Sequence, residues 1–299
     1  MTLGGCLRRA EGLYAQRGAA LGQTAAGAHD EALYLILRTL GLPLDSDPSV
    51  LRRRLSASEE AGIGSVLHRR LVDRVPAAYI TREAWLGPVR LYVDERVLIP
   101  RSYFVEIIPG QSGPWLPDPA KVTRVADVCT GCGCLAIMLA RHFRKARVDA
   151  VDLSADALDV ARINVRRHRL SGRVRLLQGD MLGPLPAGRY DVILCNPPYE
   201  PTAHVDALPA EFRREPRLAL DGGGDGLGPI RRLVRQSARR LKPHGVLMIE
   251  VGGGRAAFDR EFGRLDPHWF HTLDGSDCVC LIQAARLAPG YARARSYRA

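Results

Sequence analysis

The stretch VTRVADVCTGCGCLAIMLARHFRKARVDAVDL, residues 122–153, decides the fold class. Its two apolar runs, 122–129 and 148–153, predict buried strands, and the segment between them predicts a helix. Gly131 and Gly133 fill the turn that joins the first strand to the helix, where glycine lets the backbone approach a ligand closely. A strand, a helix and a second strand in this order form one repeat of a parallel sheet.

The same alternation of strands and helices continues toward the C-terminus. Further strands are expected at 173–178, 191–196, 245–251, 269–273 and 278–283, and helices at about 133–143, 155–168 and 227–241. This order predicts an α/β fold, a doubly wound Rossmann-like sheet with helices on both faces. Because only a short link leads into the last strand, that strand is expected to run antiparallel.

The chain before this sheet has a helical pattern. Apolar side chains recur at helical spacing in 29–42, and Ser56 and Glu59 stand at the spacing of an N-terminal capping box. The period then changes to alternation around a Gly-Pro pair, which predicts a hairpin. The predicted parts are a helical domain at 1–83, a linking hairpin at 84–100, an α/β domain at 101–285 and a mobile basic tail at 286–299.

Composition limits the class of protein. With 299 residues, of which 46% are hydrophobic, the chain can build one large or two ordinary cores, which excludes a disordered protein. It has neither an apolar run of the roughly 20 residues that span a bilayer nor the apolar core of a signal peptide at its N-terminus. The odd count of 7 cysteines fits reduced thiols. These features predict a cytoplasmic protein without membrane contact.

The net charge of +11 has two interpretations. A surplus of this size favours contact with anions, and nucleic acid is the first class to consider. Equally, the joint enrichment in Arg, Ala, Gly and Leu fits a compositional bias. Arginine pairs such as Arg69–Arg70 fall mostly on expected helix exteriors, where charge is solvated. The sequence by itself leaves both interpretations open.

The glycine turn fits two classes of cofactor. Gly131, Gly133 and Ala136 match the dinucleotide fingerprint G-x-G-x-x-A, which favours an NAD enzyme. Asp152 follows about 20 residues further on, where an acid binds ribose hydroxyls. A site for S-adenosyl-L-methionine uses the same geometry, with the glycines near the amino-acid part of the ligand and the acid on its ribose.

Three features favour the methyl donor. Asp127 ends the first strand, where a carboxylate can face the ammonium and sulfonium charges of the ligand. Asp180 and Met181 follow the third strand, where they can face the exocyclic amine of adenine, and no second Rossmann half follows. Asp127, Asp152 and Asp180 would then form an acidic pocket for a cationic cofactor. Each of these acids alone also fits a strand-end cap.

A group of cysteines occupies the same turn. Cys129, Cys132 and Cys134 lie there, and Cys278 and Cys280 follow much later. A structural zinc site needs four ligands in a closed tetrahedron, and this spacing inside a strand–turn–helix junction does not supply paired ligands. We interpret these cysteines as small buried thiols and predict no metal.

The stretch NPPYE, residues 196–200, carries the candidate chemistry. Asn196 ends a predicted strand, so it should lie at the carboxyl edge of the sheet, where such folds bind ligands. Pro197 and Pro198 stiffen the turn and lack N–H groups, so oxygen acceptors dominate it. Acceptors on both hydrogens of an NH₂ group would aim the nitrogen lone pair at a methyl group and stabilise the charge growing on nitrogen. Tyr199 offers a flat face to a planar amide or base.

Together these motifs resemble the methyltransferases that modify planar nitrogens, and most closely the ribosomal protein L3 glutamine N5-methyltransferases. The resemblance covers most of the chain. It rests on PAAYITREAWLGPVRLYVDERVLIPRS (76–102), DVCTGCGCLAI (127–137), AVDLSADALDVARIN (150–164), NPPYE (196–200), EFRREPRLALDGGGDGL (211–227) and IEVG (249–252), in this order and spacing. These motifs are specific in combination, whereas each alone is not.

The resemblance implies a function and a set of site residues. The enzyme would transfer a methyl group from S-adenosyl-L-methionine to the N5 amide nitrogen of a glutamine in L3. Asn196 and the Pro197 carbonyl would hold the glutamine amide, Tyr199 would pack beside it, and Pro198 and Arg101 would face the substrate. The cofactor would be held by Asp127, Thr130, Gly131, Gly133, Asp152, Asp180, Met181 and Asn196. The helical domain would bind the protein substrate.

The release factor glutamine methyltransferases are similar relatives. Their linker typically continues after Ile-Pro-Arg with Pro-Asp-Thr-Glu, whereas here Arg101 is followed by Ser102, Tyr103 and Phe104. Cys129 and Cys134 are also closer to the L3 type. Tyr103 and Phe104 depart from the L3 pattern, which usually has a proline and a small residue there. The substrate-facing edge of this segment is therefore expected to differ.

Other functions stay open at this point. One is the same reaction on a peptide chain release factor, and another is N6-adenine methylation of nucleic acid, which the charge favours. A third is a ribosome-associated module without enzymatic activity. The expected partner is L3, free or in a ribosomal precursor with RNA nearby, because two basic proteins should otherwise encounter each other slowly.

Overall fold

The structure is a computed structural model that describes residues 1–110 and 118–287. Two compact units share the chain. The helical unit comprises Met1–Ala84, Val93–Glu95 and Leu208–Glu215, and the sheet unit comprises Trp85–Tyr92, Arg96–Ala207 and Pro216 onward. Of the predicted tail at 286–299, residues 288–299 lie outside the described residues. No helix in the described ranges is long and apolar enough to cross a membrane.

The helical unit contains the elements α1 (Leu3–Arg17), α2 (Ala28–Thr39), η1 (Pro48–Arg52), α3 (Ala57–Leu71) and α4 (Ala77–Thr81). The predicted capping box is confirmed at the start of α3. Ser56 Oγ accepts from the Glu59 backbone N–H at 3.3 Å, and the Glu59 carboxylate accepts from the Ser56 N–H at 2.9 Å. Leu3, Leu7, Ile36, Ile63 and Leu67 belong to the apolar core of this unit.

A buried ion-pair cluster lies inside the helical unit. Arg70 is 1% exposed, its Nε donates to Glu31 at 2.6 Å, and its Nη1 lies 3.4 Å from Glu211. Arg74 also donates to Glu211, at 2.9 Å. The expectation of solvated arginine pairs is therefore wrong for Arg70. Its charge is buried because two carboxylates compensate it.

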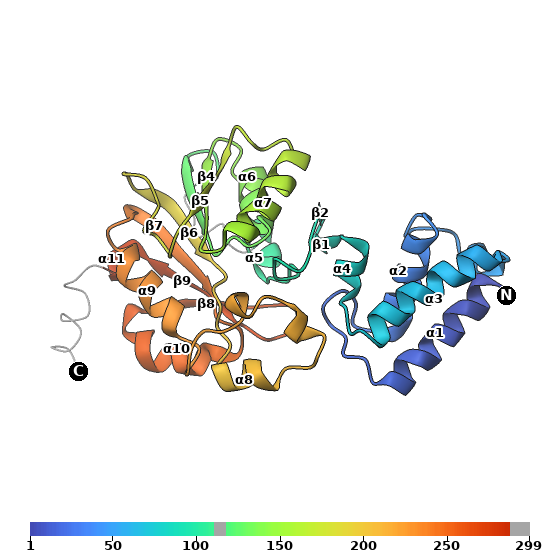
Figure 1. Cartoon of the computed structure of the whole chain (residues 1–299). Helices are drawn as coiled ribbons and strands as arrows, with labels where there is room; N and C mark the ends of the chain where they lie inside the picture. The colour runs from blue at the N-terminus through green and yellow to red at the C-terminus, as the bar shows by residue number, and fades with distance from the viewer. Residues whose placement is uncertain (111–117, 288–299) are drawn as a thin grey trace. The chain divides into compact units, whose positions relative to one another are not determined.

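The sheet unit is built on a seven-stranded sheet (Figure 1). Its strands are β3 (Arg124–Val128), β4 (Arg147–Asp152), β5 (Val174–Gln178), β6 (Tyr190–Cys195), β7 (Leu241–Glu250), β8 (His268–Phe270) and β9 (Val279–Gln283). The order is β5-β4-β3-β6-β7-β9-β8. The first five strands along this order pair in parallel, and β9 runs antiparallel to both β7 and β8. The doubly wound fold with an antiparallel last strand is confirmed.

Helices cover both faces of the sheet. In Figure 1, α6 and α7 lie together on one side and α9 and α10 on the other. The helices are α5 (Phe104–Gly110), α6 (Cys134–His142), α7 (Ala155–Arg167), α8 (Thr202–Ala207), α9 (Gly228–Ser237), α10 (Arg255–Phe262) and α11 (Ala284–Leu287), with 3-10 turns η2 (Phe212–Arg214), η3 (Arg217–Ala219), η4 (Gly252–Gly254) and η5 (Gly263–Leu265). The predicted helices α6, α7 and α9 formed. The short α5, α8 and α10 were missed because two turns give too little periodic pattern.

Two element boundaries differ from expectation. The helix expected at 227–241 ends at Ser237, because Leu241 already pairs with Tyr190 in the sheet and starts β7. The hairpin strands are β1 (Ala84–Leu86) and β2 (Val89–Leu91), shorter than the predicted 84–100. The segment after β2 instead pairs Asp94 and Glu95 with Arg82.

Candidate active site

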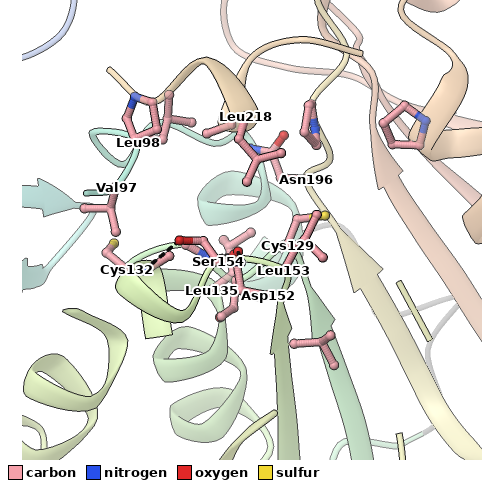
Figure 2. Close-up of a pocket in the computed structure, with 18 of the residues that line it drawn as sticks. Val97, Leu98, Cys129, Cys132, Leu135, Asp152, Leu153, Ser154, Asn196 and Leu218 are labelled. Carbon is pink, nitrogen blue, oxygen red and sulfur yellow. Dashed lines mark hydrogen bonds between the residues drawn. The ribbon is translucent and has the colours of Figure 1, made fainter. Parts of the chain in front are cut away.

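A pocket opens at the carboxyl edge of the sheet, where the turns after β3, β4, β5 and β6 meet the segments 96–102 and 216–232. Figure 2 shows Asn196 and Leu218 on one side of this pocket and Asp152 and Ser154 on the other. Eight of the residues predicted from the sequence line it together: Arg101, Thr130, Gly131, Asp152, Asp180, Met181, Asn196 and Pro198. The pocket wall therefore brings together the glycine turn, the strand-end acids and the NPPY turn, which the sequence predicted as separate motifs.

The glycine turn is fixed by backbone geometry and by Asp152. Gly131 and Gly133 have φ of 53° and 83°, in the left-handed region that favours glycine. A side chain at Gly133 would also meet the Ala161 Cβ at 3.2 Å, so this glycine brings α6 close to α7. The Asp152 carboxylate accepts from the Gly131 N–H at 2.8 Å and from the Ser154 N–H at 2.9 Å. Asp152 also lines the pocket, where its carboxylate can accept further hydrogen bonds.

Asp127 lies beneath the turn and is not part of the pocket wall. Its side chain is fully buried, and one oxygen accepts from the Thr130 hydroxyl at 2.5 Å. Burial raises the pKa of Asp127 to about 7, and the nearby Asp152 carboxylate adds to the rise. Within the described part of the chain its second oxygen has no hydrogen-bond partner. A positive charge in the pocket above Thr130 would favour the ionised form of this carboxyl.

The turn after β5 contributes Asp180 and Met181. Asp180 is exposed and its carboxylate lies 3.2 Å from the Arg232 guanidinium, another residue of the pocket wall. Met181 is buried, with a positive φ of 48° that turns the chain back under the pocket. The ion pair with Arg232 was not expected from the sequence.

Asn196 follows the last residue of β6 and faces the pocket. Its Nδ2 donates to the Arg101 carbonyl at 3.5 Å, and the amide also lies beside the Glu250 carboxyl at the end of the adjacent strand β7, where it lowers the pKa of that carboxyl. Both neighbours are acceptors, which fixes the orientation of the amide. Its Oδ1 is therefore the atom offered to a ligand.

The rest of the NPPY turn divides between the wall and the core. Pro198 lines the pocket, whereas Pro197 is buried and Tyr199 packs against the core of the sheet unit. A side chain at Gly252 would approach the Tyr199 ring to 2.3 Å, so the glycine leaves space for this ring. The side chains of Pro197, Tyr199 and Asp127, together with Gly133, thus support the pocket from behind its wall, while the backbone of Pro197 lies between the wall residues Asn196 and Pro198.

Glu250 is a residue of the site that the sequence reasoning did not single out. It is 1% exposed, and its carboxylate accepts from the Ser102 hydroxyl at 2.5 Å and the Tyr103 N–H at 3.2 Å. Burial raises the pKa of Glu250 to about 7 although these hydrogen bonds oppose the rise. The sequence did offer one signal for Glu250: it is the only acid in the predicted apolar strand 245–251. The register of Cys195 with Ile249 places the two side by side.

The pocket suits a ligand with a cationic part and flat apolar parts. Asp152 and Asp180 supply negative charge, and Val97, Leu135 and Leu153 supply apolar surface. The unpartnered buried oxygen of Asp127 adds to the acidic character below the turn. S-adenosyl-L-methionine has a sulfonium, an ammonium and an adenine ring, so these residues fit it.

The cysteines of the turn remain reduced thiols in the structure. Cys129, Cys132 and Cys134 line the pocket, and all seven cysteines are free. Across residues 1–110 and 118–287, no group of three or more His, Cys, Asp and Glu side chains has the arrangement of a metal site.

Comparison with known proteins identifies relatives over nearly the whole chain. Residues 115–227 match a family model described as "Methyltransferase small domain". The ribosomal protein uL3 glutamine methyltransferase of Burkholderia pseudomallei is 45% identical over 96% of this chain and 95% of its own length. The protein of the same name from Neisseria meningitidis serogroup A is 42% identical over 96% and 94%.

Solved structures support the fold. The catalytic domain of hMettl16, in complex with a MAT2A 3'UTR hairpin, superposes with a TM-score of 0.50 at 16% identity. The alignment covers 77% of this chain and 82% of that chain. At this identity the likeness shows a common fold.

Proposed function

The chain belongs to the family of ribosomal protein uL3 glutamine methyltransferases, and on this basis we propose how its pocket carries out the reaction. The protein transfers a methyl group from S-adenosyl-L-methionine to the N5 amide nitrogen of a glutamine in ribosomal protein uL3. The observation that carries the assignment of the site is that Asn196 shares one pocket with Gly131 and Asp152. An amide-binding turn and a cofactor turn thus meet at one edge of the sheet.

The cofactor side of the pocket is formed by this chain's own turns. Asp152 would accept from the ribose hydroxyls, and Asp180 with Met181 would border the adenine. Thr130, Gly131 and Gly133 bring the backbone close to the amino-acid part, with Asp127 below. When bound, S-adenosyl-L-methionine supplies a methyl group that its sulfonium already activates, so the reaction needs no metal.

The substrate side orients a poor nucleophile. The lone pair of an amide nitrogen is delocalised, so the residues must hold the NH₂ group in a reactive orientation. Asn196 Oδ1 and the Pro197 carbonyl would accept its two hydrogens, with Tyr199 behind the turn and Pro198 and Arg101 toward the peptide. These acceptors stabilise the positive charge that grows on nitrogen, and holding both reactants in line can supply roughly 7 kcal/mol. We further place this activity in the cytoplasm, where the substrate is made.

The function is tested by Asn196→Ala with a panel of purified substrates. The wild type should methylate uL3, whereas a release factor and an adenine-containing RNA should incorporate little label from the methyl donor. Asn196→Ala should lose at least about 100-fold in kcat, because one acceptor on the charged nitrogen is removed. Calorimetry should show that the variant still binds S-adenosyl-L-methionine. Normal methylation of uL3 by the variant would refute the site assignment, and label only in release factor or RNA would refute the substrate.

A further inference from the structure

Positive charge gathers at the edge of the sheet opposite the pocket. Because β5, β4, β3, β6 and β7 run parallel, the segments that lead into them share one amino-terminal edge. Segments 118–124, 144–149, 173–175, 186–191 and 239–244 carry three acids, Asp118, Asp149 and Asp191. The same segments carry eleven basic residues: Lys121, Arg124, Arg144, Lys145, Arg147, Arg173, Arg175, Arg189, Arg239, Arg240 and Lys242. Eleven cations less three carboxylates leave +8, out of +11 for the whole chain.

Most of these cations are available to a partner. Asp149 pairs with Arg175 at 2.7 Å and Asp191 with Lys242 at 2.8 Å, so the two buried acids of the edge are already used. Six further basic side chains are exposed and form no ion pair with any other described residue: Lys121, Arg144, Lys145, Arg147, Arg189 and Arg239. A hollow lined by Arg189, Arg235, Arg239, Arg240 and Lys242 continues the surface between β6, β7 and α9.

Helix ends explain only part of this distribution, since Arg173 donates to the carbonyls of Ala140 and Arg144 at the end of α6. Basic residues in the last turn of a helix interact with its dipole, and the effect falls off within that turn. Arg144, Lys145 and Arg147 follow the end of α6 at His142, and Arg189 stands in the turn before β6. The opposite edge is mixed in charge: Asp152 and Asp180 line the pocket there together with Arg96, Arg101 and Arg232.

We propose that this amino-terminal basic edge binds the phosphate backbone of RNA. Strands about 4.8 Å apart spread its five segments over about 20 Å, enough to contact several phosphates of an RNA backbone. Arginine dominates the edge, and its guanidinium pairs with phosphate in a bidentate geometry. The proposal rests on the proposed function in one respect: a basic enzyme and a basic ribosomal protein repel each other. RNA bound to uL3 would supply the attraction that brings the enzyme to its substrate.

Binding of a short labelled hairpin RNA, followed by fluorescence anisotropy on the full chain without cofactor or uL3, tests the proposal. The triple variant Arg144→Ala/Lys145→Ala/Arg147→Ala should bind at least about 10-fold more weakly at 0.1 M KCl. The slope of log K against log salt should fall in magnitude by roughly 2 to 3. The matched control Arg8→Ala/Arg9→Ala/Arg52→Ala removes three exposed arginines of the helical unit and should bind RNA like the wild type.

Three results would overturn the proposal. The wild type could fail to bind the RNA, or the control variant could lose as much RNA affinity as the triple variant. The wild type could also bind polyglutamate of similar length as tightly as the RNA. If the triple variant does not fold, Arg189→Ala/Arg239→Ala provides a second variant, and it should also bind the RNA more weakly than the wild type. Methylation of free uL3 should be unchanged in the triple variant and in Arg189→Ala/Arg239→Ala, because neither touches the pocket or the helical unit. If the wild type bound RNA but did not methylate uL3, the proposed function would be refuted and the proposal for the basic edge would stand.

Discussion

At the scale of single residues, the site depends on how Asn196 is held. Its amide nitrogen donates to the Arg101 carbonyl and lies beside the Glu250 carboxyl, so its oxygen is the atom that can accept from a substrate amide. Glu250 in turn is held by Ser102 and the Tyr103 N–H. The segment after Arg101, where this chain departs from the family pattern, therefore contacts the Glu250 carboxyl that lies beside the Asn196 amide.

Replacing Glu250 with Gln should change how stability depends on pH. Burial raises the pKa of Glu250 from 4.5 to about 7, so between these values the folded protein holds a proton that the unfolded chain releases. The free energy of unfolding of the wild type should therefore fall as pH rises through this window, by up to about 3 kcal/mol from this group. In Glu250→Gln this contribution to the decrease in the free energy of unfolding should be absent. Urea unfolding at pH 5 and pH 8 measures it, and parallel pH dependences for the two proteins would contradict the assignment.

At the scale of elements, α2 and α3 are joined by buried charge as well as by apolar packing. Arg70 on α3 pairs with Glu31 on α2, and Glu211 reaches the same guanidinium from the segment Leu208–Glu215. This segment comes just after the NPPY turn in the chain, yet it belongs to the helical unit. The chain thus links the NPPY turn covalently to the core of the helical unit.

Removal of the Arg70 charge should destabilise the helical unit strongly. Arg70→Met leaves Glu31 buried without its cation and Glu211 with Arg74 alone, and should cost about 3–5 kcal/mol. Arg69→Met, one residue earlier on the exposed side of α3, is the matched control and should change stability by at most about 0.5 kcal/mol. Thermal and urea unfolding followed by circular dichroism measure both. The double variant Arg70→Met/Glu31→Leu should recover part of the loss, and equal effects of Arg70→Met and Arg69→Met would show that the pair is not stabilising.

At the scale of the whole molecule, the two edges of the sheet unit differ in charge. The carboxyl edge combines acids with Arg96, Arg101 and Arg232, whereas the amino edge carries most of the chain's net positive charge. All residues of the pocket wall belong to the sheet unit, so the cofactor should stabilise that unit directly.

S-adenosyl-L-methionine at 100 times its Kd should stabilise the sheet unit by about 2.7 kcal/mol. Hydrogen exchange with and without the cofactor should show slower exchange in the turns after β3, β4 and β5. Asp152→Ala, which removes the acceptor at the centre of these turns, should lose the protection. Protection confined to residues 1–84 would contradict the placement of the cofactor.

Sequence by itself determined the order of strands and helices, the capping box of α3 and the turns that carry chemistry. These features are local: periodicity, glycine turns and strand ends are fixed by neighbouring residues. It also located Gly131, Asp152 and Asn196 at strand ends, and parallel strands place such ends at one edge. The sequence could not show whether a residue lines the pocket or lies behind its wall, as Asp127 and Tyr199 do.

Tertiary structure alone decided which distant groups meet. Glu250 lies beside Asn196 because β6 and β7 pair, Asp180 pairs with Arg232, and Arg70 is buried because Glu31 and Glu211 compensate it. The basic edge likewise arises from five segments that are far apart in the chain. The physical reason is that burial and charge pairing depend on contacts between distant residues, which no local pattern encodes.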